Sequence, residues 1–439
     1  MKALIKYAAC AVLAASCAWA QIDAAPGETP SATPESEVSR SNVVVIGLRE
    51  SNDFDDNASN TADTHYNIAT VLEPHLGLQM ARDRMKWSLD YRPGFSWNHQ
   101  LAQLNFRSQS LDGNFEYRPT KRLFLKLRDS FGVTTNTFDQ LRQNDFTPSF
   151  NFFDQPNESL FFPVTRRVNE LAAADVIYDL GPHTVAGATG NFSKMHYHSL
   201  ADTSGANGQP ADTISTGGRA FINKHISPRN WAGLEYNYTD FHSHHLDSRA
   251  KVHSIYYTHT INFTRQMAIS AFVGPEYLHD HDIFQLSFGP FTFGVPVNHS
   301  HWSWSGGATY NWAGARNSFA FSAARQVSDG AGVAVAVRLE RVQAELRRNF
   351  TGKWTGDLVA SYDRSRTLDT IAGTGSLGYF SISAGARRTL TRELSLDLRY
   401  WRTQQSIGGS SGNSLGGIPL KHNRASISLD YSFSHPLGR

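Results

Sequence analysis

The chain has 439 residues, and its 41 Lys and Arg nearly balance its 39 Asp and Glu, so the formal net charge is only +2. This balance disfavours a nucleic-acid partner, because binding many phosphates requires a concentrated basic face. Aromatic residues make up 12% of the chain, and apolar content is a moderate 40%, which suits one apolar and one wet face better than a thick globular core.

The N-terminal segment has the features of an export signal. A positive start, an apolar middle and the small-residue site Ala18-Trp19-Ala20 predict a cleaved signal peptide over residues 1–20. The segment Leu13-Ala14-Ala15-Ser16-Cys17 also fits a loose lipoprotein cleavage pattern, so the mode of cleavage stays open. Because Cys10 and Cys17 both lie within the signal, ordinary cleavage would leave no thiol or disulfide chemistry.

The next segment, residues 21–41, is rich in Pro, Ser, Thr and Glu and has almost nothing to bury. We therefore expect a disordered periplasmic leader there, followed by one structural domain over 42–439. After the signal there is no run of about 18 apolar residues, which excludes a transmembrane helix.

From Asn42 onward, apolar and polar residues alternate in segments separated by turn residues. In residues 86–98 the apolar set begins Trp87, Leu89, Tyr91 and the polar set begins Lys86, Ser88, Asp90. A β-strand places such sets on opposite faces, and a helical period does not fit them. The same alternation recurs in 302–312, 394–400 and 425–433.

The connections between these segments alternate between short and long. Short ones are predicted near residues 82–84, 120–121, 181–182, 227–228, 265–266, 314–315, 351–352 and 391–392. Longer, polar or glycine-rich ones are predicted near 54–64, 99–103, 137–166, 199–212, 243–249, 282–299, 327–334, 367–376 and 406–420. This rhythm predicts about 18 strands, an even number as single-chain outer-membrane barrels have.

Two segments fit the alternation less well. In 333–350 the apolar phase shifts between Val337 and Val342, which predicts a bulge or a late strand start near Arg341. In 167–180 the charged residues Glu170 and Asp175 take opposite phases, which weakens the strand assignment.

The fold class predicted from these patterns is all-β: a single transmembrane antiparallel β-barrel with short periplasmic turns and longer extracellular loops. A strand-built spanning structure must close on itself, because every backbone polar group in hydrocarbon needs an internal partner. Aromatic residues near predicted strand ends would form the interfacial girdles, namely Trp87, Trp97, Tyr117, Trp231, Trp312 and Trp354. A soluble β-sandwich or propeller is the alternative that this alternation leaves open.

The whole mature chain resembles bacterial outer-membrane β-barrels in its signal, its leader and its paired-strand rhythm. More narrowly, the opening stretch from Gly47 to Asn57 (GLRESNDFDDN) is similar to the first hairpin of a β-barrel porin family, some of whose members accompany exopolysaccharide export. The end departs from that pattern, since Phe433 is followed by six further residues where such barrels often finish on an aromatic residue.

Charged residues of both signs fall on the predicted inner face. Such a wall would hold water and either pass or bind polar solutes. The plainer alternative is that opposite charges pair across strands and only hold the lumen polar. The lumen-facing candidates are Lys86, Asp90, Arg92, Glu116, Arg118, Lys126, Arg128, Asp357, Asp397 and Arg399.

The longest predicted loop, 137–166, is the third outer loop, and in position it resembles the loop from which porins fold a constriction into the lumen. If it folds inward, its acids would face the basic residues of the wall and set an electric field across the narrowing. These candidates are Asp139, Asp145, Asp154 and Glu158. The alternative is an outward loop whose phenylalanines pack on one another or on a partner.

Histidines concentrate at the predicted outer rim. Loops that gather imidazoles could bind Zn²⁺ or Cu²⁺, or could close the mouth when they gain charge, although a plain hydrophilic rim is the favoured explanation. The metal candidates are His242, His244, His245, His279 and His281. Asp53, Asp55, Asp56 and Asn57 could likewise hold Ca²⁺ in the first loop, or could simply be a solvated acidic turn.

No nucleophile motif, phosphate-binding glycine loop or zinc-protease pattern is present, so we predict neither an enzyme nor a cofactor. We predict an exported outer-membrane protein that acts as a porin-like conduit for hydrophilic solutes. The alternative function is a component of exopolysaccharide secretion or surface binding without an open pore. Expected partners are outer-membrane lipid and lipopolysaccharide, the outer-membrane assembly machinery, and hydrophilic solutes or saccharide.

Overall fold

The structure is a computed structural model that describes residues 42–58, 65–134, 165–199, 211–243, 248–288, 291–330, 334–368, 376–408 and 420–437. The predicted signal peptide and leader lie outside these residues and stay predictions. Among the described residues, no helix is both long enough and apolar enough to cross a membrane.

The described residues form an 18-stranded antiparallel sheet and one 3-10 turn, Ala102–Leu104. The strands are β1 (Val43–Asp55), β2 (Asn67–Arg82), β3 (Met85–Asn98), β4 (Phe106–Tyr117), β5 (Leu123–Thr134), β6 (Thr165–Gly181), β7 (Thr184–Ser199), β8 (Thr213–Ser227), β9 (Asn230–Ser243), β10 (Ser248–Thr264), β11 (Met267–Phe288), β12 (Phe291–Ala313), β13 (Asn317–Gly330), β14 (Ala334–Asn349), β15 (Trp354–Thr367), β16 (Ser376–Thr389), β17 (Leu394–Gly408) and β18 (Leu420–Pro436).

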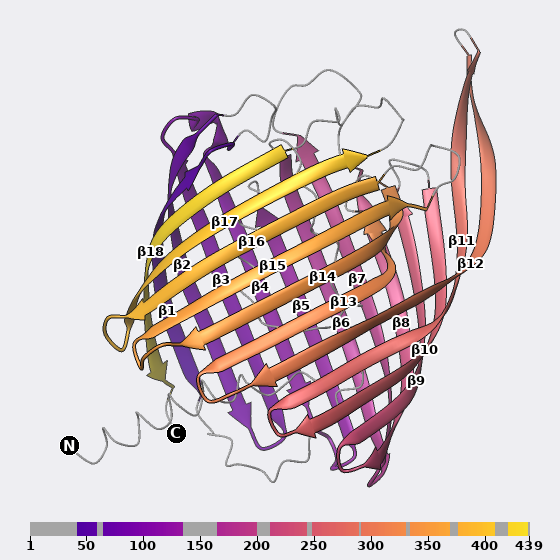
Figure 1. The fold of residues 1–439 in the computed structure, drawn as a ribbon, viewed down its shortest axis with the longest axis horizontal. Coiled ribbons are helices and arrows are strands. Elements are labelled where there is room, and N and C mark those ends of the chain that lie inside the picture. Colours follow the sequence, from indigo (N-terminus) through magenta and orange to yellow (C-terminus); the bar gives the residue numbers. More distant parts are fainter. Residues whose placement is uncertain are drawn as a thin grey trace.

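The sheet closes into a barrel because its first and last strands pair with each other (Figure 1). All 13 residues of β1 pair with β18, from Val43 opposite Pro436 to Asp55 opposite Arg424, and the same residues of β1 pair with β2 on the other side. Each other strand pairs with its neighbours in the sequence. The prediction of a closed antiparallel barrel of about 18 strands is confirmed.

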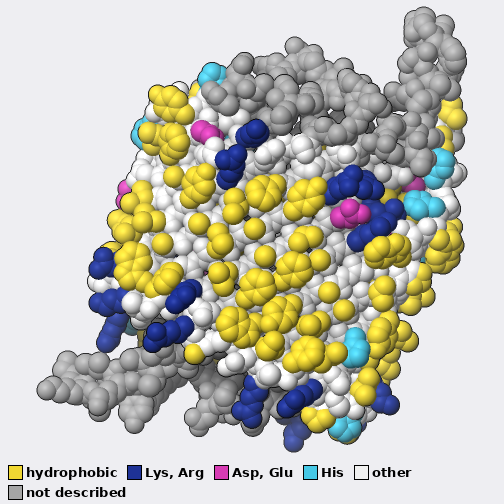
Figure 2. Space-filling view, in the orientation of Figure 1, with side chains coloured by type: hydrophobic (Ala, Val, Ile, Leu, Met, Phe, Trp, Pro, Cys, Tyr) yellow, Lys and Arg dark blue, Asp and Glu magenta, His cyan; other side chains and the backbone are white. Residues whose placement is uncertain are grey.

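Large apolar side chains cover the outside of the barrel. On β18, for example, Ile427 and Leu429 are exposed, whereas the alternating Ser426 and Ser428 are buried. Figure 2 shows the resulting apolar band across the face made by the later strands. A single closed sheet that is apolar outside and polar inside fits a bilayer, and it rules out the sandwich and propeller alternatives.

The eight predicted short connections all join consecutive strands at the end of the barrel where β1 begins and β18 ends. One long connection was predicted wrongly. Residues 282–299 were expected to be a loop, but β11 and β12 continue through them as a long hairpin with Phe288 opposite Phe291 (Figure 1). The reason is that residues with high strand propensity, such as Ile283, Phe284 and Val295, lie in this stretch, and the two strands hydrogen-bond to each other along it.

The bulge predicted near Arg341 is also wrong. β14 keeps one register with β15 from Val337 to Asn349, and its pairing with β13 shifts only next to Gly330. The shift of apolar phase has a different cause: the way β13 and β14 pack at the end of the barrel opposite to the short turns.

The weaker strand prediction at 167–180 holds, since β6 spans it. Its two acids differ because Asp175 is buried on the inner side, whereas Glu170 is exposed and lies opposite Lys194 of β7. Of the predicted girdle aromatics, Trp231 takes the inner phase, the same phase as buried Glu235 of β9, and it stacks on His225 with ring centroids 4.2 Å apart. The other five lie near strand ends in the outer phase.

Candidate functional site

The predicted lumen residues take the inner positions of their strands. On β3, β4, β5, β15 and β17 they alternate with exposed apolar side chains, namely Leu89, Tyr117, Leu127, Leu358 and Leu398. Arg118 directly follows β4, and its guanidinium lies 5.4 Å from the ring centre of Phe124. That these residues line an open pore stays a prediction.

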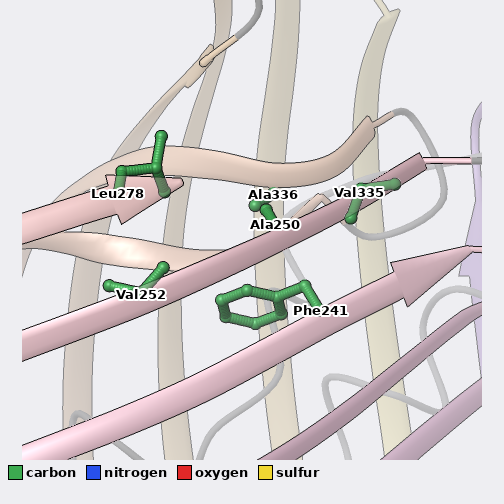
Figure 3. Packing of buried hydrophobic residues seen from close by; sticks show 6 residues of the cluster. All are labelled: Phe241, Ala250, Val252, Leu278, Val335 and Ala336. Carbon is green, nitrogen blue, oxygen red and sulfur yellow. The ribbon is translucent and has the colours of Figure 1, made fainter. Parts of the chain in front are cut away.

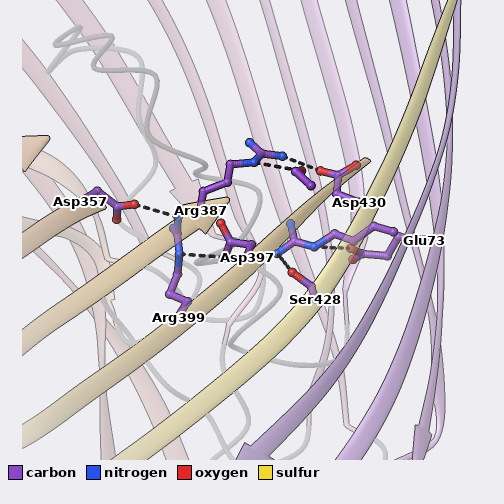
Figure 4. A network of polar contacts seen from close by, with 9 residues as sticks. Glu73, Asp357, Arg387, Asp397, Arg399, Ser428 and Asp430 are labelled. Atoms are coloured by element: carbon purple, nitrogen blue, oxygen red, sulfur yellow. Dashed lines mark hydrogen bonds and ion pairs between the residues drawn. The ribbon is translucent and has the colours of Figure 1, made fainter. Parts of the chain in front are cut away.

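On the side formed by β15–β18 and β1–β2, the inner charges form a network (Figure 4). The Arg399 guanidinium lies between two carboxylates, 3.3 Å from Asp357 and 3.8 Å from Asp397. Arg387 donates to Asp430 at 2.8 Å. Each cation therefore has an anion on the same strand or on a nearby one.

The inner face of β2–β6 is arranged in the same way. The Asp90 carboxylate lies 2.6 Å from Nε2 of His75 and 2.7 Å from Nε of Arg92, and all three side chains are on the inner face. The pairs Lys126–Glu116 and Arg128–Asp175 are 3.9 Å and 3.1 Å apart, and Lys86 lies opposite Glu116 in the ladder. Because opposite charges are paired, this wall is polar but has little local excess of either sign.

The pairing between neighbouring strands is interrupted at the junction of β12 and β13, toward the end of the barrel opposite to the short turns. Of the 23 residues of β12, only Gly306–Ala313 pair with β13. Beyond Gly306, β12 pairs only with β11, and beyond Arg325, β13 pairs only with β14. We call the end of the β13–β14 hairpin that extends beyond the pairing with β12, residues 326–330 and 334–339, the inner hairpin; its residues 337–339 still pair with β15.

The inner hairpin packs against the inner face of β9–β11. Val335 and Ala336 join a buried cluster with Phe241, Ala250, Val252 and Leu278 (Figure 3). The partly buried Val327 and Leu368 pack against this cluster. Leu278 is fully buried in it. This contact explains the apolar phase shift in the sequence, because the apolar residues of β14 point inward here and outward farther down the strand.

A polar contact adds to this packing. The buried Glu276 carboxylate of β11 accepts a hydrogen bond from Ser305 of β12, and the backbone of Val327 lies within its hydrogen-bonding reach. Beside it is a cavity of about 70 Å³ between the inner hairpin and β6–β11, lined in part by Arg219, Asn237 and Gln326. The inner hairpin therefore fills part of the barrel interior on the β9–β11 side.

The sequence did not predict this narrowing element. It placed the constriction in loop 137–166, where Asp139, Asp145, Asp154 and Glu158 lie outside the described residues. The signal that pointed to the inner hairpin was the run Val335, Val337 and Leu339, each of which is at most 5% exposed.

The metal candidates among the histidines are only partly described, because His244 and His245 lie outside the described residues. His279 bonds Ser300 at 2.7 Å and His281 bonds Asn298 at 2.5 Å. Neither they nor His242 belong to a group compact enough to hold a metal ion within the part of the chain that the structure describes. The histidine site stays a prediction.

The compact group that the described residues do contain is Asp55, Asp56 and His422, at the seam of β1 and β18. Its carboxylates already have partners, since Asp56 accepts two hydrogen bonds from Asn423, at 2.7 Å and 2.6 Å. Asp55 accepts one from the backbone of Asn57 at 2.9 Å. These hydrogen bonds join β1 to β18 at the seam, and the Ca²⁺ site stays a prediction.

No family model and no curated protein matches this chain. Solved structures of barrels are similar to it. Pseudomonas aeruginosa OccK2 (OpdF) has 9% identity over 90% of this chain and 98% of its own, with a TM-score of 0.42. P. aeruginosa OpdL is 10% identical, and the match covers 90% of this chain and 99% of OpdL with a TM-score of 0.41. The ferric citrate transporter FecA is 9% identical, and the match covers 90% of this chain and 79% of FecA with a TM-score of 0.47. Resemblance at this level leaves the function to be argued from the residues of this chain.

Proposed function

We propose that the chain is an outer-membrane conduit that passes small hydrophilic solutes through a lumen narrowed by the inner hairpin. One observation supports this function most: a closed 18-stranded barrel has an apolar outer face and a charged inner wall. A barrel of this strand number is wide enough to contain water unless it is filled from within.

The open part of the lumen lies, in this proposal, along β1–β6 and β15–β18. Those strands carry the paired charges, whereas the inner hairpin packs on β9–β11. Because the charges on the wall are paired, a solute would meet hydrogen-bonding groups and only a weak net field, so we expect weak ion selectivity. No catalytic step is assigned to the chain.

Export of the chain and its insertion into the outer membrane are part of the same proposal. Export by the signal over residues 1–20 and insertion by the assembly machinery would place the short turns in the periplasm and the long connections outside. The 137–166 loop would narrow the lumen from the side of β5 and β6, which it connects.

Planar-bilayer conductance of the refolded barrel tests this function. Replacing residues 328–337 by a two-residue Asn-Gly turn keeps Val327 opposite Arg338 and should increase the single-channel conductance, because the lumen widens where the inner hairpin lay. Shortening the β11–β12 hairpin by residues 282–297 is the matched control and should leave conductance unchanged, since that segment extends beyond the other strands (Figure 1).

The same measurement separates the two functions that the sequence left open. Steady open-channel steps support a conduit. A silent barrel that binds saccharide would instead favour the secretion or surface-binding role. Equal conductance with and without the inner hairpin would contradict the narrowing, and deletion of 137–166 tests the predicted loop constriction in the same way.

A further inference from the structure

Arginines gather on the outer face of the barrel near the place where β12 and β13 part. They take the same phase on their strands as the exposed Val342 and Tyr362, so they belong to the outer side. A dark blue group around one acidic side chain lies over these strands, above the apolar band in Figure 2. We call Arg325 of β13, Arg338 of β14, and Arg364 and Arg366 of β15 the arginine cluster.

The register leaves positive charge unbalanced in the arginine cluster. Arg338 lies directly opposite Arg366 across the β14–β15 ladder, and like charges in that position repel. Glu340 is the acid that the register places among them, opposite Arg325 and Arg364, and it is 3.9 Å from Arg325. Glu276, which is buried on the inner side of β11, also attracts Arg325 and Arg338, and the arginine cluster keeps an excess of positive charge over these two acids.

Aromatic rings and a histidine hold two of these arginines in place. The Arg325 guanidinium lies 4.5 Å from the ring centre of Trp304, which is 53% exposed, and the neighbouring Trp302 is 71% exposed. The Arg338 guanidinium is 3.5 Å from the His301 ring.

The height of the arginine cluster on the barrel indicates which ligand it meets. It lies toward the end where the long connections join the strands, and Leu346 and Leu358 of the apolar band lie below it. Guanidinium groups bind phosphate through paired, charge-assisted hydrogen bonds. Exposed tryptophans beside them are typical of the boundary between headgroups and hydrocarbon.

We propose that the arginine cluster, with Trp302 and Trp304, binds a phosphate of a phosphorylated glycolipid in the outer leaflet, of the lipid A type. This site rests on the membrane location in the proposed function, but not on an open pore. The anion would lie between Arg338 and Arg366 and relieve their repulsion. The sugar and acyl chains would lie along the exposed tryptophans and the apolar band.

Native mass spectrometry of the refolded full-length barrel with bisphosphorylated lipid A tests the site. The double substitution Arg338→Gln with Arg366→Gln should weaken lipid A binding by about tenfold or more, because it removes charge-assisted hydrogen bonds. The matched control is Arg348→Gln with Arg388→Gln at the short-turn end, where each guanidinium lies over a ring of Phe350 or Trp354. That control should bind lipid A as the unaltered barrel does.

Two further binding measurements use the unaltered barrel, one with dephosphorylated lipid A and one with inorganic phosphate as competitor. Dephosphorylated lipid A should bind the unaltered barrel as weakly as the double variant binds bisphosphorylated lipid A. Equal binding of both lipids would overturn the proposal, and so would inorganic phosphate that competes as strongly as the glycolipid. Conductance measured on the same variants keeps the two proposals apart, because it should not change when the lipid site is lost.

Discussion

Two strand junctions in this barrel are built in opposite ways. At the seam, every residue of β1 pairs with β18, and Asp53, which is buried, forms an ion pair with buried Arg424. At the β12–β13 junction, pairing covers only Gly306–Ala313, and the two strands part above it. One junction is sealed along its whole length and the other is open at one end.

The difference follows from how each junction is connected. The seam joins the two ends of the sheet, which no turn connects, so ladder bonds and buried charge pairs must hold it closed. β12 and β13 are already joined by a short turn at one end, and beyond their shared ladder each still pairs along one edge, β12 with β11 and β13 with β14. That junction is free to part, and the inner hairpin occupies the lumen as a result.

The largest effect is expected at the seam. The substitution Arg424→Ala should lower the free energy of unfolding by about 3–5 kcal/mol, because it leaves Asp53 buried without its cation. Urea unfolding of the barrel in lipid vesicles measures this change. Arg387→Ala is the control: its ion pair with Asp430 is 50% and 31% exposed, so it should cost less than about 1 kcal/mol. Equal decreases in the free energy of unfolding of the two variants would contradict a special role of the seam in stability.

A smaller and different effect is expected at the open junction. The substitution Val335→Ala removes two buried methyl groups from the packing of the inner hairpin and should weaken its docking by about 1.5 kcal/mol. The barrel itself should unfold as before, while channel recordings should show more frequent steps to a higher conductance. Val342→Ala on the same strand is the control, because that side chain is 43% exposed on the outer face. Identical recordings from both variants would contradict the role given to the inner hairpin.

Most of the fold could be predicted because strand faces and strand ends are encoded by residues close together in the sequence. A period of two residues gives the face of each strand, and turn residues give the ends, so strand number, order and closure follow from the sequence. The long β11–β12 hairpin was missed because Gly294 and Pro296 within it are typical of loops, and only pairing with the opposite strand shows otherwise.

The functional site was harder to predict because it depends on contacts between distant segments. The inner face of the wall follows from alternation, so Asp357, Asp397 and Arg399 could be placed. The inner hairpin depends on how Val335 meets Phe241, and nothing local to either residue gives that contact. A strand whose apolar phase reverses midway was the available sign, but that pattern also fits a bulge or a late strand start, which is how it was interpreted.

The central claim is that the first and last strands meet in one register, and a cross-link tests it most directly. Ser51 of β1 and Ser428 of β18 are register partners and both are buried on the inner side. With Cys10 and Cys17 replaced by serine, Ser51→Cys with Ser428→Cys should form an intramolecular disulfide in the lipid-inserted barrel, seen as a linked peptide pair by mass spectrometry. Ser51→Cys with Ser432→Cys, four residues out of register, should stay reduced. The reverse result, or no cross-link in either variant, would contradict the closed barrel.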